Sequence, residues 1–323
     1  MSKLLAICIP TFNRASYLDL CLSQICKQLI GFEDEIEIII SDNCSNDNTE
    51  QVIFKYATKY KLIKYFKQVE NIGADRNIVT VVEKSSADYF WVFGDDDILL
   101  DDKLKIIISF LRTKVYNIVY LNNYWFSNNF LEKPKNKSDK IETLIYLDGI
   151  AFLKKINIYA TFLTSSIIKS SVLLKINLNS YLGSNLCQLN WVLPSIFKAG
   201  KKLYLNSFFL ACKVGNTGGY SLFKTFSINL NEIMDNLYLQ KLIPLKTKAI
   251  LNNAFIINFM PIYYLQFKRN KHTKFIKEIA PFKMARKIYK PYFSYWFILY
   301  PVEILWYPIA KKYYFGLKKL KVI

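Results

Sequence analysis

Over the first 120 residues, short apolar runs alternate with segments of helical periodicity, and this alternation restricts the fold more than any other feature of the chain. The expected strands are Leu4–Ile9, Ile36–Ile40, Ile63–Phe66, Tyr89–Phe93 and Asn117–Leu121, and the expected helices cover about 15–30, 49–60, 75–84 and 101–113. Strands joined by helices of this length form a mostly parallel, doubly wound sheet. The sequence therefore predicts an α/β fold.

Polar, turn-forming segments follow four of the expected strands. They are Pro10–Arg14, Asp42–Asn48, Asn71–Gly73 and Gly94–Asp97. In an open parallel sheet the carboxyl ends of the strands meet at one edge, and ligands bind in the crevice outside that edge. We expect the binding site of the protein there.

The densest chemical signal is a run of five carboxylates within eight residues, directly after the fourth expected strand: Asp95, Asp96, Asp97, Asp101 and Asp102. The last two suit the start of the following helix, where acidic side chains satisfy free amides. Three adjacent like charges repel one another unless a cation lies among them, and hard oxygen ligands select Mg²⁺ or Mn²⁺. The first three aspartates predict a metal and diphosphate site, the alternative being a fortuitous acidic turn.

Several classes of protein are excluded by what the sequence lacks. No strand is followed by a Walker loop or a Gly-x-Gly-x-x-Gly segment, which argues against P-loop and dinucleotide-binding enzymes. The only histidine, His272, lies among basic residues, where a solvated surface residue is expected rather than a catalyst. The six cysteines contain no Cys-x-x-Cys and the N-terminus lacks a signal-peptide core, so we expect a cytoplasmic protein with reduced thiols.

Four motifs, in order and at the right spacing, resemble those of glycosyltransferase family 2, the inverting GT-A enzymes. They are Cys8–Arg14, Ile39–Ser45, Asn71–Gly73 and Gly94–Asp97, and they span roughly residues 1–121. The stretch from Gly183–Asn185 through Gly215–Tyr220 is similar to a bacterial subgroup that builds O-antigen, capsule or lipooligosaccharide.

The resemblance implies a nucleotide-sugar donor, usually a UDP-sugar, and assigns donor-binding roles to named residues. Pro10 and Phe12 would line the base and ribose, Asp42 and Asn43 would read the uracil edge, and Asp95 would hold the ribose. Thr11, between Pro10 and Phe12, is a further substrate-binding candidate. Asp96, with Asp97, would hold Mn²⁺ or Mg²⁺ on the diphosphate, stabilising the leaving group. Arg76 is a candidate for the diphosphate or uracil, the alternative being an ordinary surface arginine.

The resemblance leaves the catalytic base unassigned. Inversion needs a carboxylate that removes a proton from the acceptor hydroxyl. The family normally places it at the start of an acceptor-side helix, where this chain has Ser184 and Asn185, and residues 149–231 contain no Asp or Glu. The candidates are Asp97, Asp148, Glu232 and Asp235. The alternative is a catalytically degenerate subunit that binds a nucleotide sugar without transferring it.

The last third of the chain is basic and aromatic. Residues 221–323 hold 18 Lys and Arg against four Asp and Glu, a net +14 of the +19 of the whole chain. Residues 291–310 contain eight aromatic residues, three prolines and one charge, Glu303. This composition favours an interfacial position on an anionic membrane over a core or dimer-contact helix or a true span. Nucleic acid is not expected as a partner, because the aromatic residues form a block and no RNA-binding motif is present.

These inferences combine into an expected organisation. Residues 1–121 would be the nucleotide-sugar-binding half of a GT-A domain, 122–225 its acceptor-side half, and 226–323 a helical membrane-associating segment. The protein would transfer a sugar to a glycan or lipid-linked glycan in bacterial surface polysaccharide synthesis, at the inner face of the cell membrane.

Overall fold

The computed structural model describes residues 2–134, 141–215, 219–269, 278 and 280–320 of the chain. His272 and the middle of the glycine-rich segment around 216–218 lie outside the described residues. The described chain divides into two compact units, residues 1–152 with 159–214 and residues 153–158 with 215–323.

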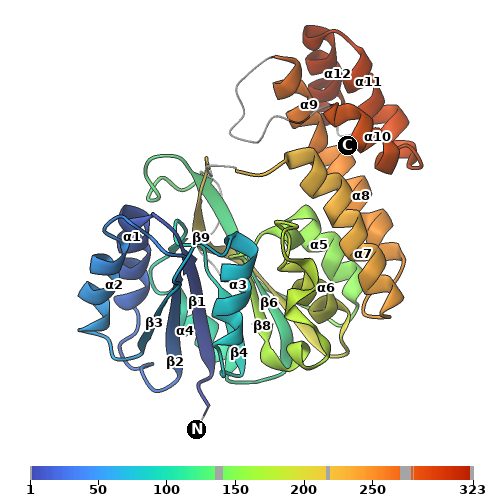
Figure 1. The fold of residues 1–323 in the computed structure, drawn as a ribbon. Helices are drawn as coiled ribbons and strands as arrows, with labels where there is room; N and C mark the ends of the chain where they lie inside the picture. The colour runs from blue at the N-terminus through green and yellow to red at the C-terminus, as the bar shows by residue number, and fades with distance from the viewer. Residues whose placement is uncertain (1, 135–140, 216–218, 270–277, 279, 321–323) are drawn as a thin grey trace. The chain divides into compact units, whose positions relative to one another are not determined.

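The first unit is built on one mixed sheet (Figure 1). Within the described residues the strand order is β3-β2-β1-β4-β8-β6-β9-β5, and β7 pairs with β9 off this path. The strands are β1 Leu5–Thr11, β2 Ile36–Asp42, β3 Ile63–Lys67, β4 Tyr89–Val92, β5 Ile98–Leu99, β6 Tyr116–Phe126, β7 Thr143–Tyr146, β8 Ser166–Lys169 and β9 Lys201–Lys213.

The directions of the strands determine at which edge of the sheet the polar segments after them lie. Strands β3, β2, β1 and β4 are mutually parallel, so β1, β2 and β4 end at the same edge, which we call the carboxyl edge. The antiparallel strand β8 separates β4 from β6, so the expected fifth parallel strand is not a direct neighbour of the fourth. Strands β6 and β9 still run in the direction of β4 and begin at the opposite edge.

Alternate residues of the buried strands face two layers of helices. The helices of this unit are α1 Ala15–Cys26, α2 Thr49–Ala57, α3 Ala74–Glu83, α4 Lys103–Leu111 and α6 Leu189–Phe197. The first half of α5 Gly149–Ile156 also belongs to it, and residues 153–156 of that helix are assigned to the second unit. Leu5, Ile7 and Ile9 of β1 belong to one apolar core with residues of α1 and α4. On the other face, Phe90 packs edge-to-face against Trp191 of α6. Burial on both faces is why these strands read as continuous apolar runs rather than as alternating ones.

The second unit is helical and rich in buried aromatic residues. It contains α7 Leu230–Leu239, α8 Lys246–Asn258, α9 Met260–Lys268, α10 Pro281–Tyr289, α11 Tyr300–Ile304 and α12 Tyr307–Lys319, with π-helical turns at Lys224–Asn229 and Tyr295–Leu299. Tyr264, Tyr289, Tyr295 and Tyr314 are fully buried. Tyrosine rings supply much of this core, as expected for side chains that bury a large apolar area.

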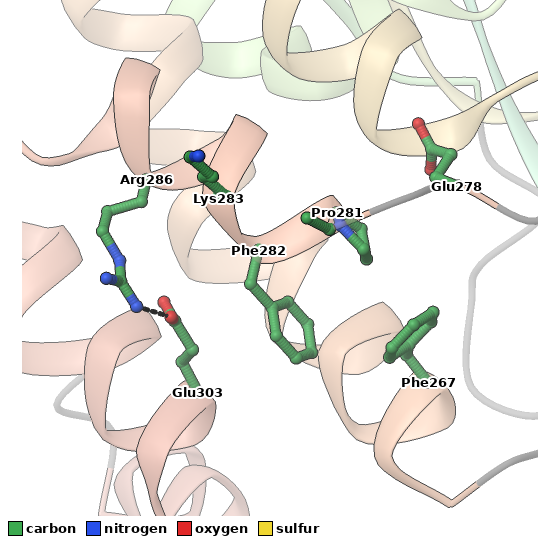
Figure 2. A pocket seen from close by; sticks show the side chains of 8 residues that line it. Phe267, Glu278, Pro281, Phe282, Lys283, Arg286 and Glu303 are labelled. Carbon is green, nitrogen blue, oxygen red and sulfur yellow. Dashed lines mark hydrogen bonds and ion pairs between the residues drawn. The ribbon is translucent and has the colours of Figure 1, made fainter.

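The aromatic block 291–310 is neither fully buried nor fully exposed. Tyr295 and Leu299 are buried, whereas the side chains of Phe293 and Trp306 are 82% and 73% exposed. Glu303, the single charge of the block, forms an ion pair with Arg286 beside the pocket lined by Phe267 and Phe282 (Figure 2). Among the described residues, no helix combines the length and the apolar character needed to cross a bilayer.

Candidate functional site

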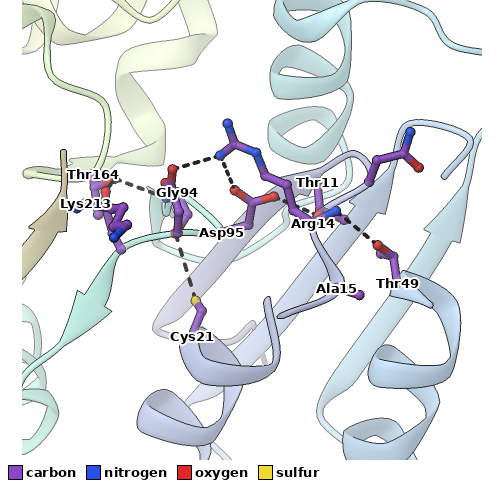
Figure 3. A network of polar contacts seen from close by, with 12 residues as sticks. Thr11, Arg14, Ala15, Cys21, Thr49, Gly94, Asp95, Thr164 and Lys213 are labelled. Atoms are coloured by element: carbon purple, nitrogen blue, oxygen red, sulfur yellow. Dashed lines mark hydrogen bonds and ion pairs between the residues drawn. The ribbon is translucent and has the colours of Figure 1, made fainter. Parts of the chain in front are cut away.

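The first motif and the acidic motif meet at the carboxyl edge because β1 and β4 are neighbours in the sheet. The hydroxyl of Thr11, at the end of β1, donates a 2.7 Å hydrogen bond to Oδ2 of Asp95, two residues beyond Phe93. Phe93 itself continues the pairing through its N–H to the carbonyl of Cys8. Two segments 84 residues apart in sequence therefore form one polar surface (Figure 3).

Arg14 supplies the cation of this surface. Its Nη1 lies 2.9 Å from Oδ1 of Asp95 and 2.9 Å from Oδ2 of Asp96. The pKa of Asp95 is raised to about 6, and burial is the main cause. The nearby guanidinium of Arg14 opposes this shift, and the negative charge of Asp96 adds to it. One guanidinium thus offsets only part of the cost of burying carboxylates side by side.

Asp97 is held inside the protein rather than at the open edge. Its side chain is nearly inaccessible. Oδ2 accepts a 2.5 Å hydrogen bond from the hydroxyl of Thr164, and Oδ1 accepts one of 3.1 Å from the backbone N–H of Lys213. Burial and the charge of Asp96 raise the pKa of Asp97 to about 7. Asp97 stays a candidate metal ligand or catalytic base, and each of its oxygens accepts one hydrogen bond from the protein.

Asp96 is the most accessible of the three carboxylates, with 19% of its side chain exposed. No three His, Cys, Asp or Glu side chains are grouped to hold a metal ion in the part of the chain that the structure describes. Mg²⁺ often binds through one or two carboxylates and completes its coordination with water and substrate phosphates. The partly exposed Asp96 fits that mode as a protein ligand.

Asp42 and Asn43 lie at the end of β2 and hold neighbouring loops. Asp42 is fully buried and accepts hydrogen bonds from the N–H of Ser45 and the hydroxyl of Tyr65. The side chain of Asn43 bridges Asn71 and the N–H of Ile72, which joins the second motif to the third. The structure brings the two motifs together as expected, through contacts that fix the shape of the edge.

The remaining donor-side residues lie in the same unit but differ in exposure. Pro10 is partly buried within β1, and the Phe12 ring is 39% exposed just beyond that strand. Arg76, in the first turn of α3, forms an ion pair with Glu83 and donates a hydrogen bond to Asn179. Phe12 is therefore partly accessible beside the carboxyl edge, while the guanidinium of Arg76 contacts Glu83 and Asn179.

Ser184 and Asn185 form a turn that is fastened to α3. Oδ2 of Asp75 accepts a 2.8 Å hydrogen bond from the N–H of Asn185, and Ser184 accepts one from the N–H of Leu186. Burial raises the pKa of Asp75, while hydrogen bonds from this turn lower it. A carboxylate does lie beside the acceptor-side turn, but it comes from α3 and serves as an anchor.

The other base candidates lie away from the acidic motif or in the other unit. Asp148 follows β7, whose Tyr146 pairs with Lys202 near the start of β9, and its carboxylate caps α5 through Ile150 and Ala151. It therefore lies at the opposite edge of the sheet from the acidic motif. Glu232 and Asp235 are exposed residues of α7 in the second unit, and Asp235 is paired with Lys248.

Three residues of the site were not singled out from the sequence: Arg14, Asp75 and Thr164. Arg14 lies inside the first motif. A basic residue in one motif and a run of aspartates in another could have suggested an ion pair between them. Asp75 and Thr164 carry no such signal, because their partners are 110 and 67 residues away.

Comparison with known proteins adds three findings. The family model described as glycosyl transferase family 2 matches residues 6–176. Abequosyltransferase RfbV of Salmonella typhimurium is 42% identical over 112 residues, which cover 34% of this chain and 33% of RfbV. The GalNAc(5)-diNAcBac-PP-undecaprenol beta-1,3-glucosyltransferase of Campylobacter jejuni is 30% identical over 135 residues, which cover 42% of this chain and 40% of that protein.

Among solved structures, Staphylococcus aureus TarS 1–349 in complex with UDP superposes with a TM-score of 0.61 at 17% identity. The superposition covers 85% of this chain and 76% of that one. At this identity the likeness concerns the fold. The sequence alignments span only a third to two fifths of the length of the two relatives named above.

Proposed function

The chain belongs to glycosyl transferase family 2, and from this membership we propose that it transfers a sugar from a nucleotide-sugar donor to a glycan or lipid-linked glycan acceptor in bacterial surface polysaccharide synthesis. The observation that carries the proposal is the meeting of Thr11, Arg14, Asp95 and Asp96 at the carboxyl edge of the sheet. Such edges of open α/β sheets bind ligands at the strand ends.

The proposed reaction inverts the anomeric centre. An acceptor hydroxyl attacks the anomeric carbon and gives its proton to a general base. The bond between that carbon and the diphosphate oxygen breaks, and the nucleoside diphosphate leaves with the electron pair. Negative charge develops on the leaving group, so cations fixed near it lower the barrier. Arg14 is a cation that lies at the acidic motif, where it pairs with Asp95 and Asp96.

The proposed donor is a UDP-sugar, with Phe12 against the base and Asp95 at the ribose. Phe12 is open enough to stack on a base, and a structure of the same fold holds UDP. Asn43 leaves the choice of base open in chemical terms, because an amide both donates and accepts hydrogen bonds. A donor panel therefore has to include cytidine, guanosine and thymidine nucleotides as well.

The proposed cofactor is Mn²⁺ or Mg²⁺, held by Asp96. A divalent cation there would neutralise the charge that develops on the departing diphosphate. The support is chemical: Asp96 offers a hard oxygen donor with part of its surface open to substrate. Thr11 and Arg14 keep Asp95 beside it in a fixed position.

A second function is favoured by one observation, the state of the base candidates. Ser184 and Asn185 occupy the turn that the family uses for its base, and both oxygens of Asp97 are bonded to the protein. On this reading the protein binds a nucleotide sugar without transferring it, as a subunit of a glycan-assembly complex. Saturable donor binding with no release of nucleoside diphosphate would favour this second function.

The second unit is proposed to associate with the inner face of the membrane. Phe293 and Trp306 are exposed aromatic side chains, and the last turn of α12 carries Lys318 and Lys319. Aromatic rings near lysines suit the interface of an anionic bilayer, where rings enter the headgroup region and cations meet phosphates. A peripheral position would bring the enzyme to a lipid-linked acceptor.

The test of the proposed function is release of free nucleoside diphosphate. UDP-, CDP-, GDP- and dTDP-sugars are incubated with the protein and Mn²⁺ or Mg²⁺, with and without a chelator. We expect slow hydrolysis of one donor class that stops when the chelator is added. If no donor is bound or hydrolysed in any combination, the proposed function is wrong.

A further inference from the structure

We propose that Arg14 is a built-in counter-ion that occupies the cation position of the acidic pair in the donor-free protein and releases Asp96 when donor and metal bind. The inference rests on the proposed function, since it concerns the same site. It predicts that the free protein binds a divalent cation poorly and that the nucleotide makes this binding tighter.

The geometry places a positive charge where a metal ligand is needed. Nη1 of Arg14 lies 2.9 Å from an oxygen of Asp95 and 2.9 Å from an oxygen of Asp96, so one atom bridges both carboxylates. A divalent cation bound to that oxygen of Asp96 would lie within a few ångströms of the guanidinium. At such distances like charges repel strongly near a protein surface. The guanidinium and the metal therefore compete for Asp96.

The two carboxylates are not equivalent in this competition. Asp95 is buried and is held a second time by the hydroxyl of Thr11 at 2.7 Å. The side chain of Asp96 is three times as exposed, at 19% against 6%. We therefore expect the ion pair between Arg14 and Asp96 to break when the metal binds, while the ion pair between Arg14 and Asp95 is kept.

The backbone around Arg14 is fixed, which limits the exchange to its side chain. The N–H of Asn13 donates to Ser45 at 2.8 Å, and Asn13 in turn accepts from the N–H of Asn46 at 2.9 Å. On the other side, the N–H of Ala15 donates to Asp47 at 3.1 Å. Three hydrogen bonds thus hold residues 13–15 against residues 45–47. The guanidinium of Arg14 can still move by rotation about the side-chain bonds of Arg14.

The released guanidinium has a chemically suitable partner in the donor. Its planar fork of N–H groups matches the oxygens of a phosphate, which Arg contacts in pairs. A diphosphate bound next to Asp96 would take over the contact that Asp96 gives up. Donor and metal would then bind together, and binding of either one would favour the other.

The test is binding of Mn²⁺ alone, followed by the electron paramagnetic resonance signal of free Mn²⁺, to full-length wild type, Arg14→Met and Arg14→Lys. The Met variant keeps an unbranched stem and loses the charge, so we expect it to bind Mn²⁺ at least about tenfold more tightly than wild type. The Lys variant keeps the charge and should stay within about threefold of wild type. Arg112→Met is the matched control, because Arg112 pairs with Glu35 elsewhere in the unit.

Two further measurements test whether the change in Mn²⁺ affinity arises at Asp96. In an Arg14→Met, Asp96→Asn double variant the gain should disappear, because the metal would have lost its ligand. In wild type, the nucleoside diphosphate identified in the donor panel should tighten Mn²⁺ binding at least about tenfold, after subtraction of the Mn²⁺ that the nucleotide binds without protein. This measurement does not depend on any variant folding. Circular dichroism checks the fold of each variant.

Equal Mn²⁺ affinity of Arg14→Met and wild type overturns the inference, as does tight Mn²⁺ binding by wild type without nucleotide. Donor hydrolysis with no Arg14 effect would overturn this inference and leave the proposed function standing. An Arg14 effect on Mn²⁺ without hydrolysis of any donor would support the inference and count against transfer.

Discussion

The carboxylate of Asp75 accepts a 2.8 Å hydrogen bond from the backbone N–H of Asn185, 110 residues further along the chain. This bond ties the first turn of α3, which follows the third motif, to the turn at 183–185, which we propose lies on the acceptor side. The two sides of the proposed active site are therefore joined by a buried charge rather than by apolar packing alone.

Replacing Asp75 by Asn should weaken the first unit. An amide offers one accepting oxygen, and its NH₂ group would face backbone N–H donors of the 183–185 turn. We expect the free energy of unfolding to fall by about 1–3 kcal/mol, the usual cost of leaving buried polar groups unpaired. Chemical denaturation measures this change. Asp34→Asn, at an exposed position, should have almost no effect, and equal effects of the two substitutions would contradict the anchoring role.

Replacing Asp97 by Asn should change the stability of the variant relative to wild type in a pH-dependent way, with the variant gaining relative to wild type as the pH rises. Burial raises the pKa of Asp97 to about 7, so its contribution to stability is fully present below the unfolded pKa near 4 and is lost as the pH rises through 7. The variant lacks this loss. We expect its melting temperature relative to wild type to be higher at pH 8 than at pH 5. A difference that does not change with pH would show that Asp97 titrates normally.

Removing the carboxylate of Asp96 should abolish donor hydrolysis while leaving the fold intact. We expect Asp96→Asn to lower the rate by about 100-fold or more, as for loss of a group that stabilises the leaving charge. The melting temperature should change little, because Asp96 is partly exposed. Asp101→Asn is the control from the same acidic segment, since Asp101 is exposed and pairs with Lys27. Equal activity of both variants would remove Asp96 from the mechanism.

Removing exposed aromatic side chains from the second unit should reduce membrane binding. We expect a Phe293→Ser, Trp306→Ser double variant to sediment several-fold less with anionic vesicles at low salt than wild type, because both rings are available to the headgroup region. Leu174→Ser is the matched control, an equally exposed apolar residue in the first unit. Wild-type protein that fails to sediment would overturn the proposal of membrane association.

The sequence predicted the first half of the sheet well, because each strand there is a continuous apolar run followed by an amphipathic helix. Strands β1 and β2 extend two residues further than expected, which places Thr11 and Asp42 within the sheet. The antiparallel β8 was not foreseen as the neighbour of β4, because four residues without a following helix give no periodic signal. The GT-A fold and the family are confirmed.

The residues of the acidic motif and its neighbours were predictable from the sequence, whereas the hydrogen bonds and ion pairs between them were not. The motifs converge as expected, but the partners of Asp97 are Thr164 and a backbone N–H of β9. Contacts of this kind depend on which strands become neighbours, and local sequence patterns do not encode that. Arg14 was part of the first motif, and its pairing with Asp96 follows only once β1 and β4 are known to be adjacent.

The bond from the N–H of Lys213 to Asp97 bears on how the protein can be divided for separate expression. Lys213 is the last residue of β9, just before the boundary between the two units. A fragment ending at Leu205 would retain the pairing of β9 with β7 but lose the residues that hold β5, and it would leave Asp97 with one donor fewer. A truncated first unit therefore has to include residue 213, and an engineered fusion is better joined beyond it.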